Sequence, residues 1–110
     1  MNYENTIKWF YLQEAKGFKF PDDAMLDISV FAYYGIPKSD SKKVKELKLS
    51  GRIRPTKRPD WDNVGKCVCD SLNKIAYHDD SNIVDGRVSK YYSDVPRLEV
   101  IIKQIQEELK

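Results

Sequence analysis

Four carboxylates and one lysine lie at spacings that could hold a divalent metal ion against a phosphate. Asp60 and Asp62 stand two residues apart where a helix is predicted to begin, and Asp79 and Asp80 follow where that helix should have ended. Lys66 comes four residues, about one helical turn, after Asp62. Magnesium prefers oxygen ligands, and a nearby lysine can stabilise charge on a phosphate. We therefore hypothesise a metal ion that acts on a phosphodiester, as in a nuclease.

The same residues also have structural explanations. A carboxylate before a helix often serves as its cap, because the helix N-terminus favours negative charge. One acid would suffice for that, whereas two acidic pairs repel each other unless a cation or neighbouring bases offset them. Lys66 could instead pair with Asp62 or Asp70 on one helix face. His78 could be a general base or an exposed turn residue, and Trp61 could stack on DNA or pack on the helix.

A basic segment lies directly upstream of the acids. Residues 42–58 carry eight bases and one acid, a charge of +7, whereas the whole chain has a net charge of +2. A basic surface beside an acidic cluster suits phosphate binding, although a solvated, lysine-rich helix face would give the same count. The candidate phosphate-binding residues, which the family resemblance described below implies to be DNA-binding, are Lys42, Lys43, Lys45, Lys48, Arg52, Arg54, Lys57 and Arg58.

The hydrophobic pattern predicts the elements upstream of the acids. Residues 3–16 have helical spacing, and residues 25–34 alternate as a strand does. Residues 42–49 form a short predicted helix, capped by a serine, with its lysines outward and Val44 and Leu47 inward. The loop that follows contains two prolines and should be extended. The inner face of the predicted strand carries Leu26, Ile28, Val30 and Ala32.

The acids themselves flank a predicted helix over residues 62–75. Its apolar positions repeat at helical spacing, so this face should pack on a sheet, with the polar side chains along the opposite side. Residues 82–92 and 97–105 predict two strands, the first with a bulge at Gly86, which pair as a hairpin. The fold class is α+β, a small mixed β-sheet packed against helices. The apolar helix positions are Val64, Cys67, Val68, Ser71, Leu72 and Ile75, and the polar ones are Asp62, Lys66 and Asp70.

Size and composition favour one folded domain over residues 1–110. Apolar residues make up 41% of the chain and aromatic residues 12%, which argues against disorder. No segment approaches the length of about 18 apolar residues that a membrane span needs, and no signal peptide opens the sequence, so we expect a cytoplasmic protein. Cys67 and Cys69 point in different directions on a helix, so we expect both to be reduced and structural.

Three linked segments around the acids resemble a known nuclease family. The segments are Pro59-Asp60-Trp61-Asp62-Asn63-Val64-Gly65-Lys66, Cys69-Asp70-Ser71-Leu72-Asn73 and Ala76-Tyr77-His78-Asp79-Asp80-Ser81-Asn82-Ile83-Val84. In this order they are similar to the P-D-x-D-N-x-x-K, D-x-L-N and D-D-x-x-[IV]-V segments of the RusA family of Holliday-junction resolvases. The similarity covers roughly residues 36–102 and extends more loosely to the first helix and strand.

The resemblance implies a small magnesium-dependent endonuclease that acts as a homodimer. Such enzymes make paired, symmetric nicks across four-way junction DNA during recombination and repair, and phage or prophage often encode them. The metal-binding acids of the family match Asp60, Asp62 and Asp80, and its catalytic lysine matches Lys66. Mn²⁺ is a candidate substitute for Mg²⁺. The candidates for supporting roles are Asp70 and Asp79.

The sequence departs from the family pattern at its front. Family members begin with a β-strand and a basic, proline-rich loop, whereas this sequence starts close to the first predicted helix. Two alternatives to an active resolvase follow. The chain could be a non-catalytic remnant that binds DNA junctions without cutting them, or a structural domain whose acids serve only as caps and turns.

Overall fold

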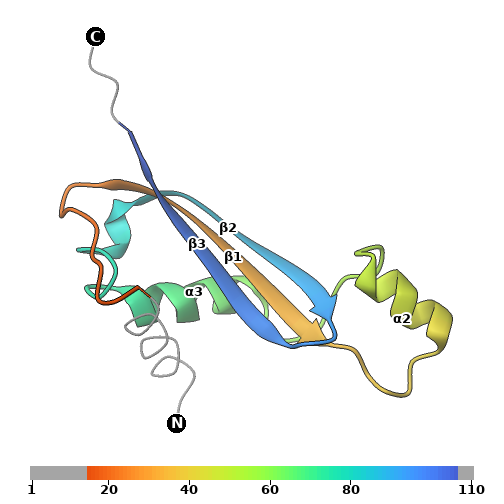
Figure 1. The fold of residues 1–110 in the computed structure, drawn as a ribbon. Coiled ribbons are helices and arrows are strands. Elements are labelled where there is room, and N and C mark those ends of the chain that lie inside the picture. The colour runs from red at the N-terminus through yellow and green to blue at the C-terminus, as the bar shows by residue number, and fades with distance from the viewer. Residues whose placement is uncertain (1–14, 107–110) are drawn as a thin grey trace.

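A computed structural model describes residues 15–106 and confirms the α+β class. The described part contains a three-stranded mixed sheet, two α-helices and one short 3-10 helix (Figure 1). The helix predicted over residues 3–16 lies outside the described residues. The elements are β1 (Met25–Gly35), α2 (Lys42–Leu49), α3 (Trp61–Leu72), η1 (Asp80–Asn82), β2 (Ile83–Ser93) and β3 (Arg97–Ile105).

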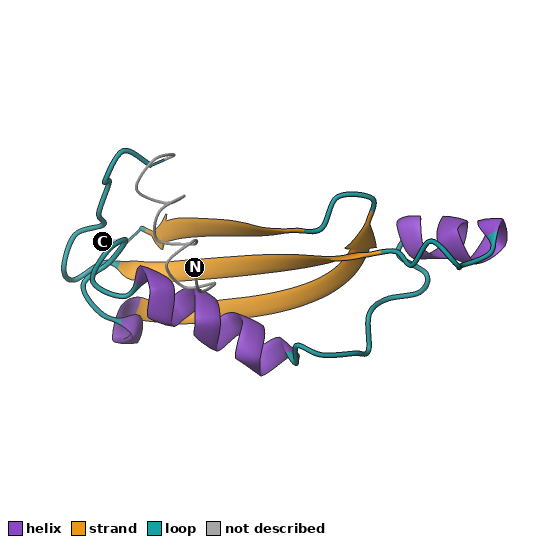
Figure 2. Cartoon of the chain, turned by 90° about the horizontal axis from the view of Figure 1, so that it is seen from below, coloured by secondary structure: helices purple, strands orange, loops and turns teal. Residues whose placement is uncertain are grey.

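The strand predicted over residues 25–34 is β1, and it forms the centre of the fold. Because successive side chains of a strand point to opposite faces, its alternation places one apolar row on one side of the sheet. The buried face of α3 packs on that row and adds Val64, Val68 and Leu72 to the core (Figure 2). The predicted inner face is confirmed, since Leu26, Ile28, Val30 and Ala32 are each at most 4% exposed.

The predicted hairpin between the last two strands is wrong. The strand order is β2-β1-β3, so β1 separates them, pairing parallel with β2 and antiparallel with β3. The connection through α3 returns the chain to the starting end of β1, which makes β2 parallel to it. A hairpin would have left β1 at an edge of the sheet. The observed order instead pairs both sides of the most buried strand.

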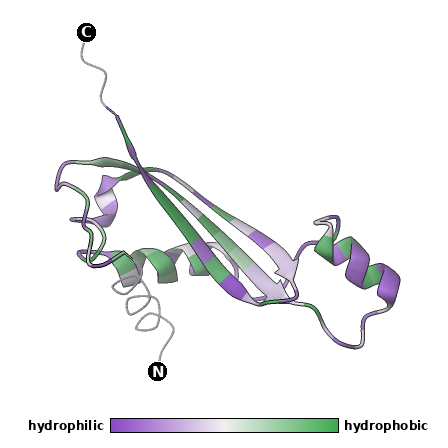
Figure 3. Ribbon diagram, viewed as in Figure 1, coloured by the Kyte–Doolittle hydropathy of each residue, from purple (hydrophilic) through white to green (hydrophobic). Residues whose placement is uncertain are grey.

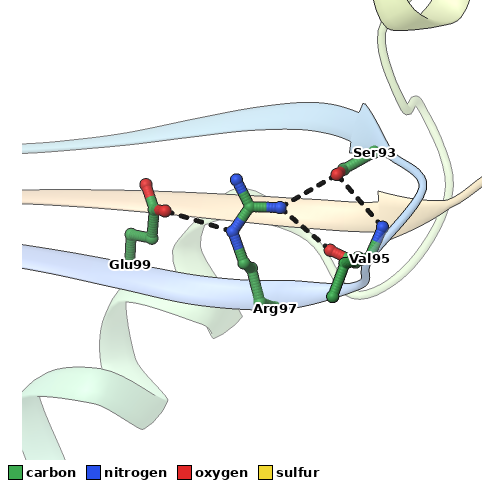
Figure 4. Close-up of polar contacts among 4 residues, drawn as sticks. All are labelled: Ser93, Val95, Arg97 and Glu99. Carbon is green, nitrogen blue, oxygen red and sulfur yellow. Dashed lines mark hydrogen bonds and ion pairs between the residues drawn. The ribbon is translucent and has the colours of Figure 1, made fainter.

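Arg97 stabilises the connection that carries the chain from β2 over the end of β1 to β3. Its Nη1 donates to Ser93 Oγ at 2.9 Å and to the carbonyl of Val95 at 3.0 Å. Its Nε donates to Glu99 Oε1 at 3.1 Å, so one guanidinium ties both ends of residues 94–96 together (Figure 4). These three residues cross the end of β1, whereas the turn of a hairpin would have joined two neighbouring strands.

The position of the bulge in β2 and the end of α3 differ from the prediction. Leu26 pairs with Ile83 and Asp27 with Asp85, so the extra residue of the bulge in β2 is Val84 rather than Gly86. Gly86 instead allows close packing of the two strands, because a Cβ at this position would lie 3.3 Å from Ile28 Cγ2 on the neighbouring strand. Helix α3 ends at Leu72 instead of residue 75, since Lys74 adopts a φ of 65° that no helix continues through.

Helix α2 has the predicted bounds but lies beyond the end of the sheet (Figures 1 and 2). Ser41 caps it by accepting a hydrogen bond from the amide of Val44 at 3.2 Å. None of its residues is buried, and it alternates between hydrophilic and hydrophobic colour (Figure 3). The prediction that all its lysines point outward is wrong for Lys48. That side chain is 12% exposed, pairs with Asp40 and lies 4.6 Å from the Tyr92 ring centre.

Candidate active site

Asp60 and Asp62 lie exposed at the N-terminal end of α3. Asp60 occupies the N-cap position, but its side chain accepts no capping hydrogen bond. Helix capping therefore does not account for the carboxylate of Asp60, although the residue lies at the N-cap position. Trp61 between them is 65% exposed, so most of its side chain is open to solvent.

The loop before these acids is fastened to the sheet. The hydroxyl of Tyr34 on β1 donates to the carbonyl of Pro59 at 2.6 Å. Burial raises the pKa of Tyr34, and the charge of Asp60 raises it further, so the hydroxyl stays protonated as the donor. Lys90 on β2 donates to the carbonyl of Lys57 at 2.7 Å. The position of Asp60 is thus set from two strands, a link that the sequence pattern did not indicate.

The polar line along α3 is confirmed. Asp62, Lys66 and Asp70 are all exposed, four residues apart, on the side of the helix opposite the core. Within residues 15–106, no carboxylate lies at ion-pair distance from Lys66, so the structural alternative of a salt bridge to Asp62 or Asp70 is not formed. The lysine is therefore available to a ligand.

The two acids of the second pair have different contacts. Asp79 caps a short helix, whereas the carboxylate of Asp80 accepts a hydrogen bond from a buried tyrosine. Asp79 is the N-cap of η1, where its side chain accepts a hydrogen bond from the amide of Ser81 at 3.0 Å. Hydrogen bonding to the side chain of Ser81, and then to its amide, lowers the pKa of Asp79. Asp80 is half-buried, and its Oδ1 accepts a hydrogen bond from the hydroxyl of Tyr77 at 3.0 Å. That tyrosine is fully buried, and its hydroxyl also lies 3.2 Å from the carbonyl of Cys69.

Tyr77 is a residue that sequence reasoning missed, because only the fold shows what its hydroxyl contacts. Burial raises its pKa, and the neighbouring charge of Asp80 adds to the effect, so the hydroxyl remains a donor. Burial also raises the pKa of Cys69, with Asp80 again contributing. Neither Cys67 nor Cys69 is part of a disulfide, as predicted. His78 is exposed in the same turn, with its Nδ1 3.9 Å from Asp22 Oδ1.

The structure separates the predicted metal ligands along α3. Asp80 lies near Cys69, and Cys69 is seven residues after Asp62, which corresponds to about 10 Å along a helix axis. Two oxygen ligands of one magnesium ion lie within about 4 Å of each other, because each bond is about 2.1 Å long. In the part of the chain that the structure describes, no three His, Cys, Asp or Glu side chains gather to hold a metal ion. Asp60 and Asp62 therefore form one group and Asp80 another.

A cavity of about 540 Å³ lies beside the first of these groups. It is bounded by the C-terminal end of β1, the N-terminal end of β3 and the N-terminal half of α3. Its walls are mostly apolar, and Pro59 next to Asp60 forms part of the rim. The residues that line it include Tyr34, Pro59, Asn63, Cys67, Pro96 and Arg97.

The sequence profile of the family described as "Endodeoxyribonuclease RusA" matches residues 1–103. This chain belongs to the RusA family. A curated relative, the uncharacterized protein YqaN of Bacillus subtilis (strain 168), is 48% identical over 82 residues, which is 73% of this chain and 58% of YqaN. The chain thus spans less than two thirds of that relative. No solved structure matches it.

The match to the RusA profile includes both acidic groups and the helix between them. It also begins at residue 1, so it extends over the front of the chain, where the sequence pattern departed most from the family. Within residues 15–106 no helix has the length and hydropathy of a membrane span. Family membership thus confirms the resemblance drawn from the three acidic segments.

Proposed function

We propose that this RusA-family chain is a magnesium-dependent endodeoxyribonuclease that resolves Holliday junctions by paired, symmetric nicks in DNA recombination and repair. The observation that carries the proposal is the exposed line at the start of α3. There Asp60, Asp62 and Lys66 make no contact with side chains of the described residues that would account for their charges. Family membership supports DNA as the substrate class.

The donor chemistry suits Mg²⁺, or Mn²⁺ in its place, because carboxylate oxygens are the ligands that hard cations prefer. We assign Asp60, Asp62 and Asp80 as metal ligands. Their positions in one chain do not fit a single ion, since Asp80 lies toward the other end of α3. Lys66 is the candidate catalytic cation. Asp79 supports the site by capping the turn that carries Asp80.

We propose that the basic segment, residues 42–58, binds DNA. The structure reduces the number of its side chains that can do so. The side chain of Lys48 is only 12% exposed and is paired with Asp40, so we leave it out of that surface. Arg54 lies 4.1 Å from the Tyr91 ring centre, and Lys57 lies 5.9 Å from that of Tyr92. These cation–π contacts hold both side chains beside the end of the sheet. The remaining bases of the surface are Lys42, Lys43, Lys45, Arg52 and Arg58.

Replacing Lys42 and Lys43 together by glutamine should weaken the salt dependence of junction binding. Each lysine that neutralises a phosphate contributes about 0.9 to the slope of log K against log salt, so the slope should fall by about two units. The measurement is a titration of labelled junction in EDTA at several salt concentrations. Lys48→Gln is the matched control, because it lies on the same helix but is paired with Asp40. Equal slopes for the two variants would contradict the assigned surface.

The test of the proposed function is cleavage of a synthetic four-way junction, with linear duplex of the same sequence as control. We expect paired nicks in the junction with Mg²⁺ and none with EDTA. Cleavage of the duplex at the same rate would contradict junction selectivity. Cleavage that EDTA does not inhibit would contradict the role of the metal.

A non-catalytic junction binder is the second candidate function. The observation that favours it is the separation of Asp80 from the other two acids in one chain. In that case the same assay would show tight, salt-sensitive binding of the junction without nicks at any Mg²⁺ or Mn²⁺ concentration.

Replacing Tyr77 by phenylalanine should raise the Mg²⁺ concentration needed for half-maximal junction cleavage by about 10-fold or more. The hydroxyl orients Asp80, and loss of such a partner typically costs 10- to 100-fold in metal affinity or activity. Junction binding in EDTA should not change, because Tyr77 is fully buried and cannot contact DNA. Cleavage measured across a Mg²⁺ titration gives the half-maximal concentration.

Tyr91→Phe is the matched control for this change. It removes the same hydroxyl from an aromatic residue on β2 whose described ring contacts are with Tyr33 and Arg54. We expect its Mg²⁺ titration to follow that of the unsubstituted chain. A Tyr77→Phe titration that also does so would show that the hydroxyl does not position Asp80 for metal binding.

A further inference from the structure

We propose that Asn82 is a positioning residue for Asp80, because its side chain fastens the turn that carries Asp80 to the segment before β1. This inference rests on the proposed function, which makes Asp80 a ligand of Mg²⁺. It concerns the direction of this one carboxylate, so it holds whichever other ligands complete the site. Asn82 is the last residue of η1 and lies two residues after Asp80.

The side chain of Asn82 makes three hydrogen bonds, each of 2.9 Å. Its Nδ2 donates to the carbonyls of Asp22 and Ala24, and its Oδ1 accepts from the amide of Asp79. Because a carbonyl only accepts and a backbone amide only donates, these partners fix which end of the side chain is the nitrogen. Aspartate has the same shape but lacks both donors, so the contacts require the asparagine amide.

These bonds lie where the sheet begins. Ala24 directly precedes β1 and Asn82 directly precedes β2, and the first pair of the two parallel strands is Leu26 with Ile83. In Figure 1 the short helix η1, drawn in cyan, lies beside the segment that leads into β1. The side chain of Asn82 therefore continues the connection between the two strands beyond their last ladder pair. It joins residues that are 58 and 60 positions apart in the sequence.

The turn needs such a connection because η1 is short. A 3-10 helix of three residues is stabilised only weakly by its own backbone bonds, which have poor geometry. Asp79 and Asn82 add a capping box, in which each side chain accepts a hydrogen bond from a backbone amide of the turn. All these bonds lie within the turn, so they fix its shape. The two bonds from Asn82 Nδ2 fix its place relative to the sheet.

The carboxylate of Asp80 is thus oriented in two ways. The hydroxyl of Tyr77 holds one of its oxygens at 3.0 Å, and Asn82 holds the backbone of the turn. Mg²⁺ requires near-ideal octahedral geometry, so a small displacement of a ligand weakens binding. The polar atoms of Asn82 already have partners, and we therefore assign it no direct contact with the ion. Its effect on metal binding passes through Asp80.

Replacing Asn82 by alanine, Asn82→Ala, should raise the Mg²⁺ concentration needed for half-maximal junction cleavage by about 10-fold or more. This is the lower end of the loss that is typical when a partner of a metal ligand is removed. The rate at saturating Mg²⁺ should return close to that of the unsubstituted chain, because the ligand itself is unchanged. Calorimetric titration with Mn²⁺ in the absence of DNA should show a similar rise in the dissociation constant. Junction affinity in EDTA should stay the same.

Val100→Ala is the control for a loss of stability alone. Val100 is partly buried on β3 and pairs with Val30 in the middle of β1. Its thermal midpoint should fall while its metal titrations follow those of the unsubstituted chain. If Asn82→Ala does not fold, Asn82→Ser should show the same rise, since a hydroxyl has one donor and cannot bond both carbonyls. An Mn²⁺ titration of the Asn82 variants that matches the unsubstituted chain, or an equal shift in Val100→Ala, would overturn the inference.

Combining Asn82→Ala with Tyr77→Phe tests whether both residues act through Asp80. Changes that act on one shared group are not additive. The Mn²⁺ dissociation constant of the double variant should therefore rise by less than the product of the two single effects, and a rise equal to that product would contradict the assigned role. If the unsubstituted chain bound no Mn²⁺, the inference would fall with the proposed function. If it followed the expected Mn²⁺ pattern but did not cleave junctions, the proposed function would fail while the role of Asn82 stood.

Discussion

Replacing Asp62 by asparagine, Asp62→Asn, lowers the rate of junction cleavage by more than about 100-fold. A metal ion supplies several kcal/mol of transition-state stabilisation, and each 1.36 kcal/mol corresponds to about tenfold in rate. The substitution keeps the shape of the side chain but removes the charge that binds the ion. Because Asp62 is exposed and the basic segment is untouched, junction affinity in EDTA should stay the same. Single-turnover cleavage and a parallel binding titration measure the two effects.

Asp94→Asn is the matched control for this prediction. It removes the same charge from an exposed aspartate in the connection between β2 and β3, which is not part of either acidic group. We expect it to cleave junctions at the unsubstituted rate. Asp62→Asn cleaving at that rate as well would show that the exposed acids of α3 do not hold a catalytic metal.

Replacing Leu26 by alanine should lower the free energy of unfolding by about 3 kcal/mol, because truncation of a buried leucine typically costs 2–5 kcal/mol. Leu26 is fully buried on β1, the strand that pairs with both others. Each kcal/mol shifts the melting temperature of a domain of this size by about 4–8 °C, so the midpoint should fall by more than 10 °C. Chemical and thermal unfolding followed by circular dichroism measure both quantities.

The matched control is Leu49→Ala on α2, where the side chain is 51% exposed. A surface substitution of this kind usually changes the free energy of unfolding by no more than about 0.5 kcal/mol. If Leu26→Ala does not fold at all, the milder Leu26→Val should still be clearly less stable than the unsubstituted chain. A loss at position 26 no larger than that at position 49 would contradict the central place of β1 in the core.

Local spacing was enough to predict most of the elements. The alternation in residues 25–34 gave the buried face of β1 because side-chain direction in a strand has a period of two. The bounds of α2 were right because a capping serine and a Ser-Gly stop enclose it. The end of α3 was wrong by three residues, since the apolar spacing continues to Ile75 while the backbone already turns at Lys74.

The order in which the strands pair could not be predicted from the spacing of apolar residues within each strand. Residues 83–93 and 97–105 are separated by a short turn, which is the pattern of a hairpin. The strand order depends on how much apolar surface β1 buries between two partners, and that is a property of the whole sheet. For the same reason, the contacts of Lys48 with Asp40 and Tyr92 could not be seen in a run of lysines.

For the candidate site, the sequence by itself determined the family, the identity of the acids and the exposed line of Asp62, Lys66 and Asp70. Residue type and helical spacing are local quantities that one chain displays directly. Only the tertiary structure decided that Tyr34 and Tyr77 anchor the two acidic segments and that α3 keeps those segments about 10 Å apart. The physical reason is that α3 is a rigid rod, whose length separates its two ends however close they lie in the sequence.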